Sequence, residues 1–164
     1  MDRDVRGLES LKDLFDAFHD GAIETWRWDR ARHTLTLGIE IEYLARLTGS
    51  CQTRFEVTLL GVRACRFEPW CENGSGGRDR PGDVFAGDLG ILSATVERAR
   101  LNVLCLEHSP APGGGGGNLV LACDRARVKD PAGRAYSIDE FQALARRYWT
   151  TWSRRGWKIP RPGP

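Results

Sequence analysis

The sequence lacks long apolar runs and a secretory leader, and it has very little lysine. It contains no stretch of about 18 apolar residues, so no membrane span is expected. The first residues, MDRDVRGLESLKDLF, have neither the basic start nor the apolar centre of a signal peptide. We therefore expect a cytoplasmic protein. Arginine supplies most of the 24 basic residues, because only three of them are lysines.

Cysteine is present, but without the spacing that crosslinks or metal sites require. The five cysteines are Cys51, Cys65, Cys71, Cys105 and Cys123. Three of them lie inside apolar runs, where a thiol behaves as a small hydrophobic group. A zinc site built from Cys65, Cys71 and a distant histidine lacks the usual paired ligands. We therefore predict no disulfide framework, no metal and no other cofactor.

The length and composition are those of an ordinary globular domain. The chain has 164 residues, of which 41% are hydrophobic and 28% are charged. We expect one domain over residues 1–164. The glycine-rich segments 71–83 and 109–117 are predicted to be flexible loops, and 157–164 an extended tail. The net charge of +2 does not by itself indicate a polyanionic partner.

Two segments carry helical periodicity. Residues 8–18 repeat leucine and phenylalanine at helical spacing and predict a short amphipathic helix that ends near Gly21. Near the other end, Ser137 and Glu140 form a capping box ahead of the apolar stripe of a second helix. Gly156 and Pro160 are expected to end that helix.

Between these helices the sequence favours strands. Segments 22–28, 34–44, 54–70, 90–99, 100–108 and 118–128 are rich in β-branched, aromatic or alternating residues. Gly61 is expected to form a bulge within the third of them. The order predicts an α+β fold: an antiparallel meander of about six strands, with the N-terminal and C-terminal helices packed on it.

The first candidate site is the sequence Phe18-His19-Asp20 at the end of the first helix. A histidine beside an aspartate could be a general base with its orienting carboxylate. The alternative is a helix terminus, in which the histidine faces the negative end of the helix dipole and the aspartate binds turn amides. We favour the alternative, because no nucleophile is marked nearby.

A second candidate lies on the sheet. Glu40 and Glu42 are two residues apart and therefore lie together on the outer face of the predicted strand 34–44. Glu56 could join them from the next strand. Such carboxylates usually form a solvated face, but they could also form a negative patch for a basic partner. Trp26 and Trp28 share one face of strand 22–28 and are either core residues or a binding platform.

A third candidate is the basic C-terminus, which has six basic and no acidic residues from Phe141 onward. Basic residues interleaved with aromatics are typical of single-strand nucleic-acid binding. The same pattern arises when one helix stripe packs on a sheet and arginines solvate the other side. The residues concerned are Arg146, Arg147, Trp149, Arg154, Arg155 and Trp157.

Three segments carry a resemblance to a class of small, mostly uncharacterised bacterial proteins. They are FHDGAIETW (18–26), HTLTLGIEIEY (33–43) and FEVTLLGVRACRF (55–67). Some proteins of this class resemble the immunity proteins of bacterial polymorphic toxin systems, which bind and neutralise a toxin. The resemblance implies a cytoplasmic, non-catalytic protein whose exposed sheet face or loops meet one protein partner.

The sequence has no Ser/His/Asp arrangement, nucleotide-binding fingerprint or HExxH motif. We therefore expect a non-enzymatic protein-interaction domain, with Glu40, Glu42 and Glu56 as its candidate surface. Two alternatives stay open. One is a nucleic-acid-associated accessory protein that uses the basic C-terminus, and the other is an enzyme centred on His19 and Asp20.

Overall fold

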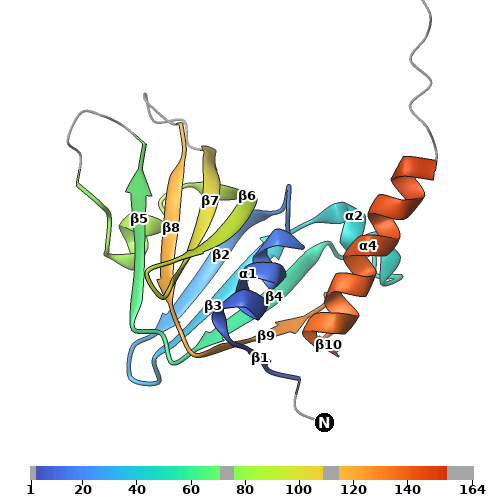
Figure 1. The fold of residues 1–164 in the computed structure, drawn as a ribbon, viewed down its shortest axis with the longest axis horizontal. Coiled ribbons are helices and arrows are strands. Elements are labelled where there is room, and N and C mark those ends of the chain that lie inside the picture. The colour runs from blue at the N-terminus through green and yellow to red at the C-terminus, as the bar shows by residue number, and fades with distance from the viewer. Residues whose placement is uncertain (1–2, 71–75, 109–114, 155–164) are drawn as a thin grey trace, which may run out of the picture.

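The computed structural model describes residues 3–70, 76–108 and 115–154, and it has an α+β fold (Figure 1). The described residues form one antiparallel sheet with helices packed on it. The strands are β1 (Val5–Arg6), β2 (Ala22–Asp29), β3 (Thr34–Glu40), β4 (Arg54–Leu60), β5 (Ala64–Pro69), β6 (Asp88–Glu97), β7 (Arg100–His108), β8 (Gly117–Ala122), β9 (Arg125–Lys129) and β10 (Ala135–Tyr136). The helices are α1 (Leu8–Asp16), α2 (Glu42–Leu47), α3 (Pro81–Val84) and α4 (Ile138–Arg154).

The sheet is not the simple meander that the sequence predicted. Its order is β1-β9-β4-β3-β2-β6-β7-β8-β5, and β10 pairs with β9. Two three-stranded meanders, β2-β3-β4 and β6-β7-β8, are joined where β2 meets β6. The predicted α+β class and antiparallel pairing are confirmed, whereas the number and order of the strands were wrong. In Figure 1 the group β5 to β8 is steeply inclined to the group formed by β2, β3, β4 and β9.

Gly61 accounts for one of these differences. The segment 54–70 is two strands rather than one bulged strand, and β4 and β5 belong to different parts of the sheet. Gly61 adopts a left-handed φ of 67° between them, which a glycine tolerates best. A Cβ at this position would collide with the carboxylate of Asp124, so the chain also needs the absence of a side chain here. In the same way, 118–128 is divided into β8 and β9.

The strand predicted over 34–44 ends early. Strand β3 stops at Glu40, and α2 begins at Glu42. Ile41, Leu44 and Ala45 are buried, which is the spacing of one helix face. Alternation and helical periodicity overlap over so short a run, so the sequence could not distinguish them.

The core lies between the sheet and the helices α1 and α4. Leu35, Leu37 and Ile39 of β3 are fully buried, as are their partners Leu59, Val57 and Phe55 on β4. Directly opposed residues of antiparallel strands share a face, so this ladder forms the apolar side of the sheet. Leu11, Leu14 and Phe15 of α1 are buried against it, mainly over β6.

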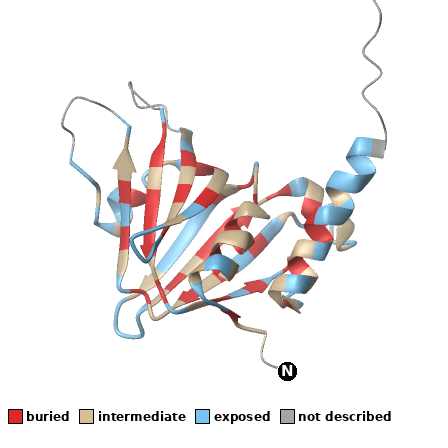
Figure 2. Cartoon of the chain, viewed as in Figure 1, coloured by how far each residue is buried: buried red, intermediate tan, exposed pale blue. Residues whose placement is uncertain are grey.

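The C-terminal helix begins as predicted and then leaves the sheet. The Glu140 N–H donates to Ser137 Oγ at 3.2 Å, and the Ser137 N–H donates to Glu140 Oε2 at 2.9 Å, which confirms the capping box. Phe141, Leu144 and Ala145 are buried. From Arg146 to Ser153 no residue is fully buried, and Figure 2 shows this end of α4 extending beyond the sheet.

The predicted loop 71–83 is partly structured. Arg78 forms a bridge with Phe67 of β5, and α3 begins at Pro81. Residues 71–75, most of 109–117 and the tail 157–164 lie outside the described residues. Within the described part of the chain, no helix has the length and apolar character needed to cross a membrane.

Candidate functional site

His19 is held by a bulge in β6. The register of the β6–β7 pair shifts between Ile91 and Ser93, so Leu92 is the extra residue and its carbonyl leaves the ladder. Nδ1 of His19 lies 2.5 Å from that carbonyl oxygen. Because a carbonyl only accepts, Nδ1 carries a proton and donates it. Nε2 of the same ring lies 3.5 Å from Oδ1 of Asp20.

The two residues after His19 extend the sheet. The Asp20 N–H donates to the Ile91 carbonyl at 2.9 Å, and the Ile91 N–H donates to the Gly21 carbonyl at 2.7 Å. Asp20 has a φ of 66°, a conformation that aspartate tolerates better than most residues. Phe18, whose side chain is fully buried, completes this segment. The motif Phe18-His19-Asp20 thus joins the end of α1 to β6.

The same histidine borders a cluster of aromatic rings. Tyr43 of α2 donates from its hydroxyl to the His19 carbonyl at 2.5 Å and stacks on Tyr148 with 4.0 Å between ring centroids. Trp149 lies 6.1 Å from the rings of both His19 and Trp152. We call these five residues, from three separate segments, the aromatic end of α4.

The aromatic end of α4 is partly open to solvent. Trp149 is 39% exposed and Trp152 is 52% exposed, and the side chains of His19 and Asp20 are exposed as well. Burial, with a smaller effect of the Asp20 carboxylate, raises the pKa of Tyr43, which keeps its hydroxyl a hydrogen-bond donor. The cluster therefore combines fixed ring positions with exposed apolar area.

Two cations flank these rings. Arg146 and Arg147 are exposed on α4, and within the described part of the chain neither has a carboxylate oxygen within 4.0 Å. Both guanidinium groups can therefore meet an anion from outside. Of the other predicted basic-terminus residues, Arg155 and Trp157 lie outside the described residues, as does the side chain of Arg154.

The acidic ladder predicted on the sheet is not a patch of one sign. Oε2 of Glu40 lies 3.9 Å from Nε of Arg54, and Oε1 of Glu56 lies 4.0 Å from Nζ of Lys129. Glu42 is not on this strand at all, because α2 begins there, and it pairs with Arg46 on the same helix. Its predicted place beside Glu40 on the sheet face was therefore wrong.

A groove of about 800 Å³ crosses this outer face of the sheet, and Glu40 and Glu56 line it. Gly38 is also part of its lining, and a Cβ there would collide with Oγ1 of Thr25. The groove alternates basic and acidic side chains, as expected for a solvated sheet face. Neither His19 nor Asp20 lines this groove.

Trp26 and Trp28 lie on the core-facing side of β2, opposite Leu37 and Leu35. Trp28 packs against the core, whereas Trp26 is 37% exposed and stacks on Phe85 with 5.6 Å between centroids. The core interpretation is confirmed for Trp28, and Trp26 lies on the same side of β2 but is partly exposed. Their different exposure reflects the position of β2 in the sheet rather than the residue type.

The cysteines are dispersed. Cys65, Cys105 and Cys123 are buried with free thiols, Cys51 is exposed, and Cys71 lies outside the described residues. Among residues 3–70, 76–108 and 115–154, no group of three or more His, Cys, Asp or Glu side chains is placed to hold a metal ion.

The Phe18-His19-Asp20 motif and the tryptophans of α4 had separate signals in the sequence, and the structure brings them together. Tyr43, which was assigned to a strand, and Tyr148 were not marked as functional residues by any such signal. In comparisons with known proteins, no family model, curated protein or solved structure matches the chain.

Proposed function

We propose that this chain is a non-catalytic binding domain for a partner protein, and that the aromatic end of α4 is its contact surface. The observation that carries the proposal is the exposure of Trp149 and Trp152 on a helix that projects beyond the sheet. Tryptophan, tyrosine and arginine are the residues that most often dominate the energy of protein interfaces. An immunity-type role, in which the partner is a toxin, is the form of this function that the resemblance of residues 18–67 implies.

The geometry favours binding by preformed contacts. Tyr43 and Tyr148 stack on each other, and both meet the exposed ring of Trp149 edge-on, so the position of this ring is set before a partner binds. A rigid aromatic group loses little conformational entropy on binding, which increases the affinity that a given area supplies. Arg146 and Arg147 would steer a partner whose surface carries carboxylates.

A double variant at the exposed rings tests this proposal. The wild-type protein and Trp149→Ala/Trp152→Ala are used to capture proteins from nuclease-treated lysate of the native host, and the captured protein is then purified for calorimetry. We expect a stoichiometric partner whose affinity falls by a factor of about 30 or more in the double variant, as hot-spot residues predict. The matched control is Trp70→Ala, because Trp70 is 49% exposed on another part of the molecule. Equal affinity of all three proteins for the captured partner would refute the proposal.

A second candidate function is binding of single-stranded nucleic acid by the same end of α4. It is favoured by the guanidinium groups of Arg146 and Arg147 next to Trp149, which have no carboxylate partner among the described residues. Fluorescence anisotropy with a labelled oligothymidine tests it. Binding should weaken steeply between about 50 and 200 mM salt, and Arg146→Glu/Arg147→Glu should abolish it. Absence of binding at the lower salt concentration would exclude this candidate.

A further inference from the structure

Strand β2 is paired on both sides only at its beginning. Strand β3 pairs with β2 from Ala22 to Asp29, whereas β6 pairs only with Ala22 and Ile23. Among the described residues, no other segment forms a backbone hydrogen bond with residues 25–29. The N–H and C=O groups that point away from β3 over this stretch, the free edge of β2, therefore have no strand beside them.

Exposure along β2 agrees with the missing neighbour. Four consecutive residues, Glu24 to Arg27, are exposed, although a strand with one buried face alternates between buried and exposed. Phe85 stacks on Trp26 and covers the face of the sheet there, but it does not pair with the strand.

Strand β5 is the last strand of the sheet order, and one of its edges has no neighbouring strand among the described residues. Phe67 exchanges two backbone hydrogen bonds with Arg78, at 2.7 and 2.8 Å, so this side of β5 points away from β8. Cys65 comes two residues earlier, so its N–H and C=O groups point to the same side. Within the described part of the chain, no backbone hydrogen bond is formed to the N–H or C=O group of Cys65 on this side. Each of the two strands thus has an edge with unpaired backbone groups.

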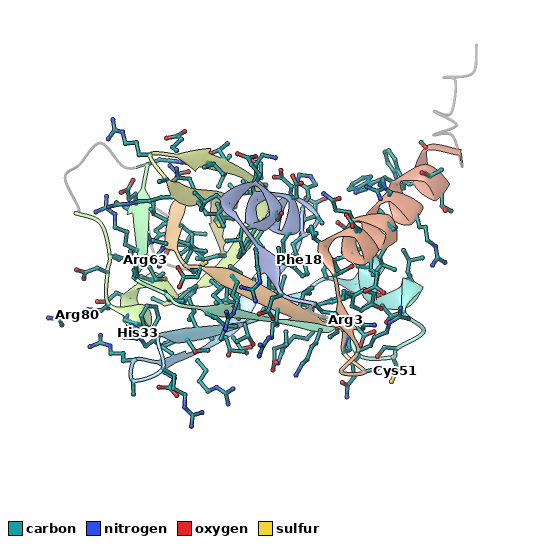
Figure 3. The ribbon with its side chains drawn as sticks, turned by 60° about the horizontal axis from the view of Figure 1, so that its bottom comes forward. Arg3, Phe18, His33, Cys51, Arg63 and Arg80 are labelled. Carbon is teal, nitrogen blue, oxygen red and sulfur yellow. The ribbon has the colours of Figure 1, made fainter. Side chains whose placement is uncertain are left out.

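A cavity of about 590 Å³, which we call the seam, lies between the end of β2 and the edge of β5. Trp28 and Arg30 line it from the end of β2, and Ala64, Cys65 and Arg66 line it from β5. Adjacent residues of a strand point to opposite faces, so a cavity that touches all three lies against the edge of β5. Figure 3 marks this end of the molecule with His33, Arg63 and Arg80, whereas Cys51 lies at the opposite end.

The charges beside the seam favour an acidic occupant. Among the described residues, the lining of the seam has three arginines and one carboxylate, that of Asp79. In the described part of the chain, neither Arg30 of this lining nor Arg27 on the outer face of β2 has a carboxylate oxygen within 4.0 Å. A second copy of this chain is a poorer occupant. If residues 25–29 of two copies paired in full as antiparallel strands, Arg27 of one copy would lie directly opposite Arg27 of the other. Like charges in directly opposed positions destabilise a strand pair.

We propose that the seam binds an extended, acidic segment of a partner protein, which adds to β2 as a strand. Main-chain hydrogen bonds to the free edge of β2 supply affinity, and side-chain contacts supply specificity. In the bound segment, the carboxylate opposite Arg27 lies on the outer face of the sheet. The apolar residues just before and just after it point to the other face, toward the cavity beside Trp28. This surface is separate from the aromatic end of α4 and does not depend on the function proposed for that end.

Two matched peptides test the proposal on the full chain. They are the acetylated, amidated pentapeptides Val-Glu-Val-Glu-Val and Val-Lys-Val-Lys-Val, titrated to millimolar concentration into 15N-labelled protein. The glutamate peptide should shift the amide resonances of residues 27–30 and 64–66 and slow hydrogen exchange at the free edge. The lysine peptide should bind about three to five times more weakly, as expected when one cross-strand ion pair becomes a repulsion.

Four variants show whether the peptides bind at the seam itself. Arg27→Glu should reverse the preference between the two peptides, and Ala64→Trp, which fills the cavity, should abolish both titrations. Arg98→Glu in the β6–β7 turn is the control for net charge, and Trp149→Ala/Trp152→Ala should leave the peptide affinity unchanged. The proposal is wrong if neither peptide shifts the seam amides or if Arg27→Glu leaves the preference unchanged. It is also wrong if light scattering finds a dimer whose seam amides are already protected.

Discussion

The ring centroid of Phe18, at the end of the N-terminal helical segment, lies 4.7 Å from the ring centroid of Phe141 in the C-terminal helix. Phe55 of β4 completes the contact, at 5.8 Å from Phe18 and 5.6 Å from Phe141. All three side chains are fully buried. This group therefore attaches α4, and with it the exposed tryptophans, to the sheet.

Truncation of Phe141 should be one of the costlier changes in the protein. Phe141→Ala removes a ring that three other rings contact, and the expected loss in the free energy of unfolding is about 3–5 kcal/mol. Trp152→Ala, which removes an exposed ring, should change it by less than about 0.5 kcal/mol. Urea denaturation monitored by circular dichroism measures both. Similar losses for the two variants would contradict the assignment of Phe141 to the core.

The bond between His19 and the bulge carbonyl of Leu92 should contribute to stability. His19→Ala removes the donor and a ring contact with Trp149, so we expect a loss of about 1–2 kcal/mol in urea denaturation. Asp20→Asn is the control, because asparagine also tolerates a positive φ and keeps the backbone bonds. If the control destabilised the protein as much as His19→Ala, the 3.5 Å contact between the Asp20 carboxylate and Nε2 of His19 would matter more than the bond to Leu92.

Gly61 and Gly49 form a matched pair for testing backbone strain. Both have a left-handed φ, 67° and 78°, but a Cβ at Gly49 meets no atom within 4 Å, whereas at Gly61 it meets Asp124. Gly49→Ala should cost about 1 kcal/mol for the conformation alone. Gly61→Ala should cost more, and Asp124→Ala should relieve the excess in the double variant. Equal costs for the two glycine variants in thermal unfolding would show that Asp124 moves aside freely.

The capping box makes the N-terminus of α4 sensitive to acid. The hydrogen bond from the Ser137 N–H is the main cause that lowers the pKa of the Glu140 carboxyl below its usual 4.5, with nearby arginines adding to it. The resulting stability is complete above the unfolded pKa and is lost as the pH falls through the lowered folded value. Urea midpoints of wild type and Glu140→Gln should therefore differ at pH 7 and converge below pH 4. A constant difference across this range would contradict the assignment.

The buried thiols should resist labelling. Burial raises the pKa of Cys65 and Cys105 to about 12 and that of Cys123 to about 11, so the reactive thiolate is scarce at neutral pH. With iodoacetamide at pH 8, mapped by mass spectrometry, Cys51 should be modified first because it is exposed. Rapid labelling of Cys65 in the folded protein would mean that the seam opens more widely than the structure shows.

Several features could be read from the sequence because their signals are local. The box formed by Ser137 and Glu140 is set by two residues three positions apart, and the structure contains both of its hydrogen bonds. The alternation in 34–40 likewise identified the strand and its buried face. Such patterns depend on the spacing of neighbouring residues, so they survive without knowledge of the fold.

The pairing of strands could not be read in this way. Whether Gly61 forms a bulge or a turn depends on the strands that follow, because β4 pairs with β9 and β5 with β8. Whether Ile41 continues a strand depends on the burial of Leu44 and Ala45. The gap between β2 and β5 has no local signal at all, because it results from β6 diverging from β2 after two paired residues.

The sequence by itself determined the α+β class, the beginnings of the two main helices and the apolar face of most strands, since each follows from local periodicity and capping. The predicted end of the second helix, at Gly156 and Pro160, lies outside the described residues. The tertiary structure alone decided that the Phe18-His19-Asp20 motif and the tryptophans of α4 share one surface, and that the sheet carboxylates are paired with cations. Both depend on contacts between residues far apart in the chain. Such contacts are selected by the packing of the whole core rather than by any short segment.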